Sequence, residues 1–158
     1  MDIGSKRGYP SASLSNFAPH EFYMEGIYCA SMEGFLQSLK FENPEVQKEV
    51  CKLVGLKAKY KGKHKKWWKT HKLYWKGIEY DRFSGEYQLL LDKAFSELSK
   101  NNSFRKALLA TQNSNLTHTI GKRKESETIL TRSEFCSRLL KLRRLINGYT
   151  SKSGCFCK

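Results

Sequence analysis

The chain has 158 residues, of which 39% are hydrophobic and 13% aromatic. These values indicate one folded domain with a normal core and exclude intrinsic disorder. The formal net charge of +14 favours anionic partners, and no apolar run approaches the roughly 20 residues of a membrane span.

The N-terminus lacks a charged segment followed by an apolar one, so no secretory signal is predicted and a cytoplasmic location is expected. The five cysteines are odd in number and do not have the spacing of a disulfide framework, which favours free thiols. Neither a metal-ligand cluster nor a glycine-rich nucleotide loop is found, so no metal and no cofactor is expected.

The first predicted elements are a β-hairpin and a helix. The hairpin spans residues 22–29 and turns at Glu25-Gly26. The helix spans residues 31–40, because its apolar side chains recur at i, i+4 and i+7. Its polar side chains have the same spacing and form a second face beside the buried one; they are Glu33, Gln37 and Lys40. A carboxylate, an amide and an ammonium aligned beside a buried face suit the wall of a site.

Four more helices are predicted, each beginning at a capping residue; the caps are Asn43, Ser84, Ser103 and Thr131. The first is expected to end at Gly55 and the last at Gly148. Residues 56–76 have poor periodicity and predict a loop with one helical piece, and a short strand is expected near residues 116–120.

The predicted fold class is therefore α+β, a mostly helical single domain with a small β-hairpin or short sheet. The domain is expected to span residues 1–149, and residues 150–158 to form a flexible tail.

Residues 57–76 contain no acidic side chain and form a lysine-rich segment in which aromatic residues are interleaved. Its lysines are Lys57, Lys59, Lys61, Lys63, Lys65, Lys66, Lys69, Lys72 and Lys76. Such a composition is expected of a surface that faces phosphates or nucleic acid. The alternative is a solvated face that only keeps the protein soluble.

Several of these residues together resemble the NADAR (YbiA-like) family. The resemblance begins with residues 14–19, continues through Glu25-Gly26 and includes Ser31-x-Glu33 with Gln37 and Lys40; this first block is fairly specific. Weaker matches follow around Trp75, at residues 108–111 and at Leu142-Arg143. The resemblance implies a small domain associated with NAD and ADP-ribose metabolism, in a family whose characterised members are N-glycosidases.

The implied activity is hydrolysis of an N-glycosidic bond to a phosphorylated or ADP-linked ribose, including removal of ADP-ribose from a nucleic-acid base. Such a reaction builds positive charge at the anomeric carbon, and a carboxylate stabilises this charge and orients the attacking water. The resemblance assigns this catalytic role to Glu33. The alternative for Glu33 is a favourable interaction with the helix dipole. The alternative for the whole chain is a non-catalytic module that binds ADP-ribose or nucleic acid.

Trp75 and Asp81 are the other catalytic candidates. The resemblance points to a functional tryptophan, whose indole can stack on a base; Trp75 matches best, with Trp67 and Trp68 as rivals and a core position as the alternative. Asp81 is a candidate second carboxylate and Arg82 a candidate phosphate ligand. Equally, these two residues suit a local ion pair near a helix start.

The substrate-binding candidates are Asn16, Phe17, Gln37, Lys40, Arg82, His118 and Lys122, with Lys6 and Arg7 as weaker phosphate ligands. The family carries an acid and an aromatic-Trp-Gly cluster after the equivalent of Leu116, but residues 117–128 contain neither Asp nor Trp. Glu125 or Glu127 are candidates to replace the acid, and His118 and Lys122 to replace part of the pocket.

Overall fold

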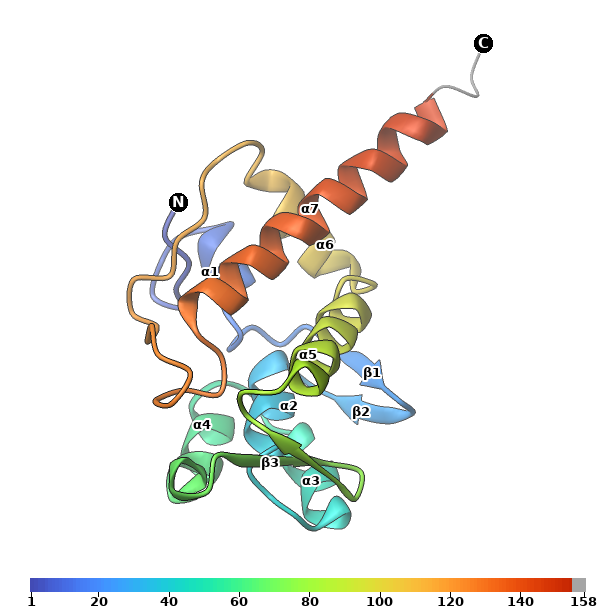
Figure 1. The fold of residues 1–158 in the computed structure, drawn as a ribbon. Coiled ribbons are helices and arrows are strands. Elements are labelled where there is room, and N and C mark those ends of the chain that lie inside the picture. The colour runs from blue at the N-terminus through green and yellow to red at the C-terminus, as the bar shows by residue number, and fades with distance from the viewer. Residues whose placement is uncertain (155–158) are drawn as a thin grey trace.

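The computed structural model describes residues 1–154. Helices dominate this part of the chain, and two antiparallel hairpins complete it (Figure 1). The elements in chain order are α1 (Ser11–Leu14), β1 (Phe22–Met24), β2 (Ile27–Cys29), α2 (Met32–Ser38), α3 (Pro44–Cys51), α4 (Gly55–Lys63), the 3-10 helix η1 (Trp67–Lys69), β3 (Lys72–Trp75), β4 (Ile78–Asp81), α5 (Gly85–Leu98), α6 (Asn102–Ala110) and α7 (Arg132–Gly154). The predicted α+β class with a helical majority is confirmed.

The predicted first hairpin is present as β1 and β2. Phe22 pairs with Cys29, and the turn consists of Glu25 and Gly26 with φ values of 48° and 81°. Two successive left-handed residues match the right-handed twist of a hairpin, which is why a glycine follows the turn's first residue.

The predicted helix at residues 31–40 is present as α2. The Ser31 side chain accepts a hydrogen bond of 3.0 Å from the backbone of Gly34. A Cβ at Gly34 would lie only 2.6 Å from the Leu53 carbonyl oxygen, so a glycine lets the loop after α3 approach α2 closely. This packing holds the first turn of α2, and with it Glu33, in one position.

The prediction for residues 43–76 was partly wrong. Asn43 caps α3 as expected, but α3 ends at Cys51, and Gly55, with φ of 60°, begins α4 instead of ending α3. Residues 56–76 are not a loop with one helical piece: they complete α4 and form η1 and β3. A second hairpin of β3 and β4, turning at Lys76-Gly77, was not predicted.

The caps of α5 and α7 are as predicted. Ser84 accepts a hydrogen bond from the backbone of Tyr87 at the start of α5. At the start of α7, the Thr131 amide donates a 2.8 Å bond to the Glu134 carboxylate, and the Glu134 amide donates a 3.1 Å bond to the Thr131 hydroxyl. This pair of bonds is the predicted capping box.

Three other details differ from expectation. Asn101, not Ser103, caps α6, because its side chain accepts from Phe104. The expected strand near residues 116–120 is only an isolated bridge between Asp2 and Thr117. Helix α7 does not end at Gly148 but continues to Gly154, and the rest of the expected tail lies outside the described residues.

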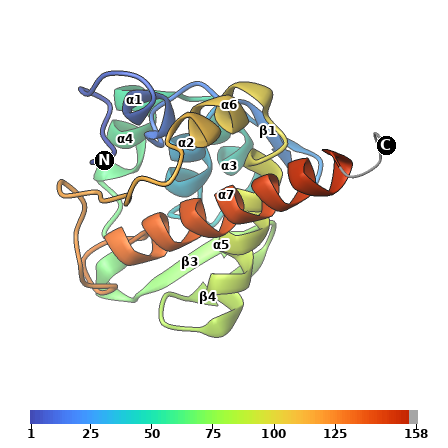
Figure 2. The ribbon, with the colours of Figure 1, turned by 90° about the horizontal axis from the view of Figure 1, so that it is seen from above.

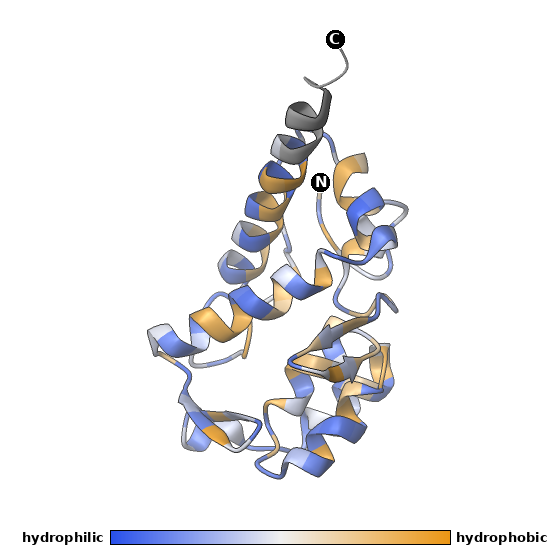
Figure 3. Cartoon of the chain, turned by 90° about the vertical axis from the view of Figure 1, so that its right-hand side faces the viewer, coloured by the Kyte–Doolittle hydropathy of each residue, from blue (hydrophilic) through white to orange (hydrophobic). Residues whose placement is uncertain are grey.

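The core lies between α2, α5, α6 and α7, and α7 crosses α5 and α6 (Figure 2). These helices carry both hydrophobic and hydrophilic residues, as expected for helices with one buried face (Figure 3). The buried face of α7 carries Phe135, Leu139, Leu142 and Ile146, as predicted. Cys29, Cys51 and Cys136 are free thiols. Within residues 1–154, no helix has both the length and the apolar character needed to cross a bilayer.

Candidate functional site

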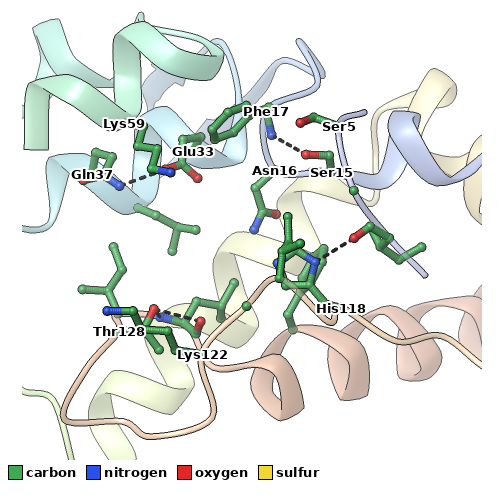
Figure 4. Close-up of a pocket in the computed structure, with 18 of the residues that line it drawn as sticks. Ser5, Ser15, Asn16, Phe17, Glu33, Gln37, Lys59, His118, Lys122 and Thr128 are labelled. Carbon is green, nitrogen blue, oxygen red and sulfur yellow. Dashed lines mark hydrogen bonds between the residues drawn. The ribbon is translucent and has the colours of Figure 1, made fainter. Parts of the chain in front are cut away.

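A cavity of about 760 Å³ lies between α2, α4, the N-terminal segment and the loop that precedes α7 (Figure 4). Most of the predicted site residues line it: Asn16, Phe17, Glu33, Gln37, Lys40, His118 and Lys122. These side chains come from segments far apart in the sequence, so the fold brings together what the motifs only suggested.

Glu33 lies in the first turn of α2, and its backbone amide donates a bond of 3.0 Å to the carbonyl of Asn16. Its carboxylate faces the cavity and accepts a 2.8 Å bond from Gln37 Nε2 (Figure 4). Burial raises the pKa of Glu33, and the Gln37 bond and the charges of Lys40 and Lys59 oppose this shift without cancelling it. Glu33 is therefore a half-buried carboxylate held beside two cations.

Gln37 is held from its other side by α4. A carboxylate only accepts hydrogen bonds, so the Gln37 nitrogen faces Glu33 and the amide oxygen faces away. This oxygen packs against Gly62, is buried and has no hydrogen-bond partner within the described structure. The amide thus serves mainly to orient Glu33.

Two cations approach Glu33 from different segments of the chain. Lys40 follows α2, and burial lowers its pKa while the charge of Glu33 opposes that shift. Lys59 comes from α4 and lines the same cavity. Sequence reasoning placed Lys59 only within the lysine-rich segment. It missed this role because the periodicity of α4 was too weak to show which lysine faces α2.

The N-terminal segment forms a further wall. The backbone amide of Ile3 donates a 2.7 Å bond to Thr117, and Asp2 accepts bonds of 2.8 Å from the backbone and the hydroxyl of Thr119. The two Thr119 bonds, together with the bond from the Thr117 hydroxyl and the charge of Arg7, hold the pKa of Asp2 at about 2. The pairing places Lys6 and Arg7 at the cavity, as their weaker assignment suggested.

The loop before α7 supplies His118, Lys122 and Glu127 to the cavity, whereas Glu125 does not line it. His118 Nδ1 lies 2.8 Å from the carbonyl oxygen of Ile3, and the ring packs edge-on against Phe135 at 5.1 Å. The stretch that departs from the family pattern therefore still contributes an imidazole, an ammonium and a carboxylate.

Trp75, Asp81 and Arg82 do not line the cavity, which corrects their predicted grouping with Glu33. Trp75 is 1% exposed and packs against Phe35 in the core, since its β3 position points inward. Asp81 accepts a 2.7 Å bond from the backbone of Phe83 at the start of α5. The indole that does line the cavity belongs to Trp67, which the sequence offered as a rival.

Arg82 is wholly buried and is bound to Glu134 through two bonds of 2.6 and 3.1 Å. Its Nε donates to the carbonyl of Thr128, a residue of the cavity wall. Burial raises the pKa of Glu134, but the bonds from Arg82, Thr131 and Gln88 outweigh it and lower the pKa. Arg82 is thus occupied in anchoring the loop before α7, and its partner is on a helix rather than at Asp81.

Comparison with known proteins identifies the family of this chain. The family model described as bacteriophage protein GP30.3 matches residues 8–144. The chain belongs to this family. It is 36% identical over 146 residues to the "Uncharacterized 17.1 kDa protein in Gp30-rIII intergenic region" of Enterobacteria phage T4, covering 90% of this chain and 96% of the phage T4 protein.

Among solved structures, this member of the GP30.3 family is similar to the NMR structure of the E. coli protein YbiA. The TM-score is 0.59 over 95% of this chain and 86% of YbiA, at 15% sequence identity. The fold is therefore that of YbiA, as the sequence resemblance implied. No group of three or more His, Cys, Asp or Glu side chains that could hold a metal ion is found within the part of the chain described.

Proposed function

We propose that the protein hydrolyses N-glycosidic bonds to a phosphorylated or ADP-linked ribose. The observation that carries this proposal is the half-buried carboxylate of Glu33, fixed by Gln37 at the wall of a cavity large enough for a nucleotide-sized ligand. The YbiA fold and the family resemblance of the Ser31-x-Glu33 motif support the same reaction class.

The cavity provides groups for each part of such a substrate. Glu33 lies where a carboxylate can stabilise an oxocarbenium-like centre and accept a proton from the attacking water. Asn16 offers an amide for hydrogen bonds to sugar hydroxyls. The cationic side chains around the cavity suit phosphate groups; they are Lys6, Arg7, Lys40, Lys59 and Lys122.

The lysine-rich segment favours a substrate in which the ADP-ribose is attached to a nucleic-acid base. Helix α4 contributes Leu56 and Lys59 to the cavity, while Tyr60 and Trp68 are exposed farther along the same segment. Lys63 lies over the ring of Tyr60 at 5.5 Å, and Lys69 over that of Trp68 at 5.9 Å. A strand bound by these cations and rings would have its bases next to the cavity.

The experiment is to incubate the protein with ADP-ribosylated DNA and with free phosphorylated ribosyl compounds, and to measure released sugar. Glu33→Gln keeps the size and hydrogen bonding of the side chain, and we expect it to lower turnover by ~10²-fold or more with unchanged melting temperature. Glu45→Gln is the matched control, because Glu45 lies in the first turn of α3 but away from the cavity.

The outcomes separate the alternatives. Equal activity of Glu33→Gln and wild type would leave Glu33 with only its helix-dipole role. Tight binding of ADP-ribose without any release of sugar would identify a non-catalytic binding module instead.

A further inference from the structure

His118 is held so that only one of its ring nitrogens can exchange protons with a ligand. Nδ1 lies 2.8 Å from the Ile3 carbonyl oxygen, and a carbonyl only accepts hydrogen bonds. Nδ1 therefore carries its proton in both the neutral and the charged imidazole. Proton gain and loss then take place at Nε2 alone.

The other ring nitrogen, Nε2, has no hydrogen-bond partner among the described residues. The backbone of Gly121 lies beside the neighbouring Cδ2 atom. A Cβ at Gly121 would lie 2.5 Å from Cδ2 and 3.1 Å from Nε2, so any other residue there would press against this edge. Phe135 fixes the plane of the ring from the side.

The position of His118 relative to Glu33 completes the arrangement. The two side chains project from opposite walls of the cavity, with the Asn16 side chain between them (Figure 4). His118 also borders a second hollow of about 460 Å³, which is lined by residues of the same loop and of the start of α7. His118 thus borders both hollows, and solvent in the second one can return a proton to it.

We propose that His118 is a catalytic residue that donates a proton from Nε2 to the nitrogen of the departing base. The proposal rests on the N-glycosidase function proposed above and assigns its leaving-group step. The anomeric C–N bond breaks, both bonding electrons go to the base nitrogen, and this nitrogen takes the Nε2 proton. Water then adds to the anomeric carbon and gives one proton to Glu33. Solvent carries that proton back to His118, which restores both groups.

Several charged and titratable groups surround His118 and would contribute to the pH dependence of turnover. Those on the cavity side are Asp2, Lys6, Arg7, Glu33, Lys40, Lys59, Lys122 and Glu127, and those on the second hollow are Arg123 and Arg132. Glu33 lies across the cavity from His118, and the charge of His118 acts to lower the pKa of Glu33.

The test compares two forms of a substrate that the wild type hydrolyses: the natural base, and the same base alkylated on a ring nitrogen so that it departs without a proton. In His118→Asn the side-chain N–H can still reach the Ile3 carbonyl, but nothing replaces Nε2. We expect this variant to lose ~10²–10⁴-fold in turnover of the natural base and to hydrolyse the alkylated form like the wild type. His118→Leu also loses the bond to Ile3, so its melting temperature measures how much this bond contributes to stability.

Equal losses on both forms, or no loss on either, would overturn the proposal while leaving the glycosidase function intact. If the wild type released sugar from neither form, the proposed function itself would fail. A measurement without turnover covers that case: ¹⁵N NMR of labelled histidine should show the neutral ring protonated at Nδ1. A neutral ring protonated at Nε2 would contradict the assignment.

Discussion

Gly62 lies so close to Gln37 that a Cβ added to the glycine would be 1.9 Å from Gln37 Oε1. The contact joins α4 to α2, and the opposite end of the same amide binds Glu33. The position of the proposed catalytic carboxylate therefore depends on the absence of a side chain on a neighbouring helix.

Gly62→Ala should lower activity although residue 62 does not touch the cavity. The new methyl group would displace the Gln37 amide and release Glu33 from its fixed orientation, since such close contacts force a shift. We expect a fall in kcat with little change in KM. Gly85→Ala is the matched control, because nothing lies within 4 Å of a Cβ at that position. A fully active Gly62→Ala variant would show that Gln37 does not depend on this contact.

The two tryptophans Trp75 and Trp67 should behave in opposite ways. Trp75→Ala removes a core indole, which costs ~3–5 kcal/mol of unfolding free energy, so denaturant unfolding should show a large loss of stability. Trp67→Ala changes the cavity wall and should mainly weaken ligand binding, measured by titration of folded protein. If Trp75→Ala were stable but bound ligand more weakly, Trp75 would belong to the binding site after all.

Arg82→Met should destabilise the protein strongly. It leaves Glu134 buried without its partner, and breaking a buried pair in this way costs ~3–5 kcal/mol. Lys72→Met is the control, because Lys72 and Glu79 form an exposed pair at 3.4 Å that contributes about 0–1 kcal/mol. Urea unfolding of both variants measures the difference. Similar small losses in the two would mean that the loop before α7 does not need its anchor.

The lysine-rich segment should give the protein a salt-dependent affinity for single-stranded nucleic acid. Replacing Lys61, Lys63, Lys65 and Lys66 by Gln should weaken binding and flatten the slope of log affinity against log salt, because fewer counterions are released. The matched control changes four lysines that form ion pairs elsewhere, namely Lys48, Lys52, Lys93 and Lys100. Equal effects of both sets would indicate a response to net charge alone.

The N-terminal wall should loosen in acid. The folded-state pKa of Asp2 is about 2, below the ordinary value of 3.8, so its stabilising contribution is complete above pH 3.8 and is lost as the pH falls towards 2. Hydrogen exchange of the Thr119 amide should accelerate over this window. Asp2→Asn should show the faster exchange already at neutral pH, and slow exchange in that variant would mean that Ile3 alone secures the segment.

The sequence predicted those features that depend on neighbouring residues. The Glu25-Gly26 turn, the Ser84 cap and the Thr131–Glu134 box are each complete within four residues, so their local chemistry is sufficient. The polar face of α2 followed from helical periodicity alone.

Features that depend on distant partners were not predictable in this way. Arg82 is paired with Glu134, 52 residues along the chain, so its neighbour Asp81 was misleading. A glycine after a helical pattern usually marks the end of a helix, yet Gly55, with its left-handed backbone, begins α4. Lys59 joins the site only because Gly62 lets α4 approach α2.

The cavity walls come from the first residues of the chain, from α2 and α4, and from the loop before α7. A ligand that bridges these walls would bind the folded state and not the unfolded chain, so its binding energy adds to the stability of the whole domain. At a concentration of 100 times Kd this increment is about 2.7 kcal/mol. A thermal-shift screen of ribosylated and ADP-ribosylated compounds can therefore rank substrates of the catalytically impaired Glu33→Gln variant without any turnover.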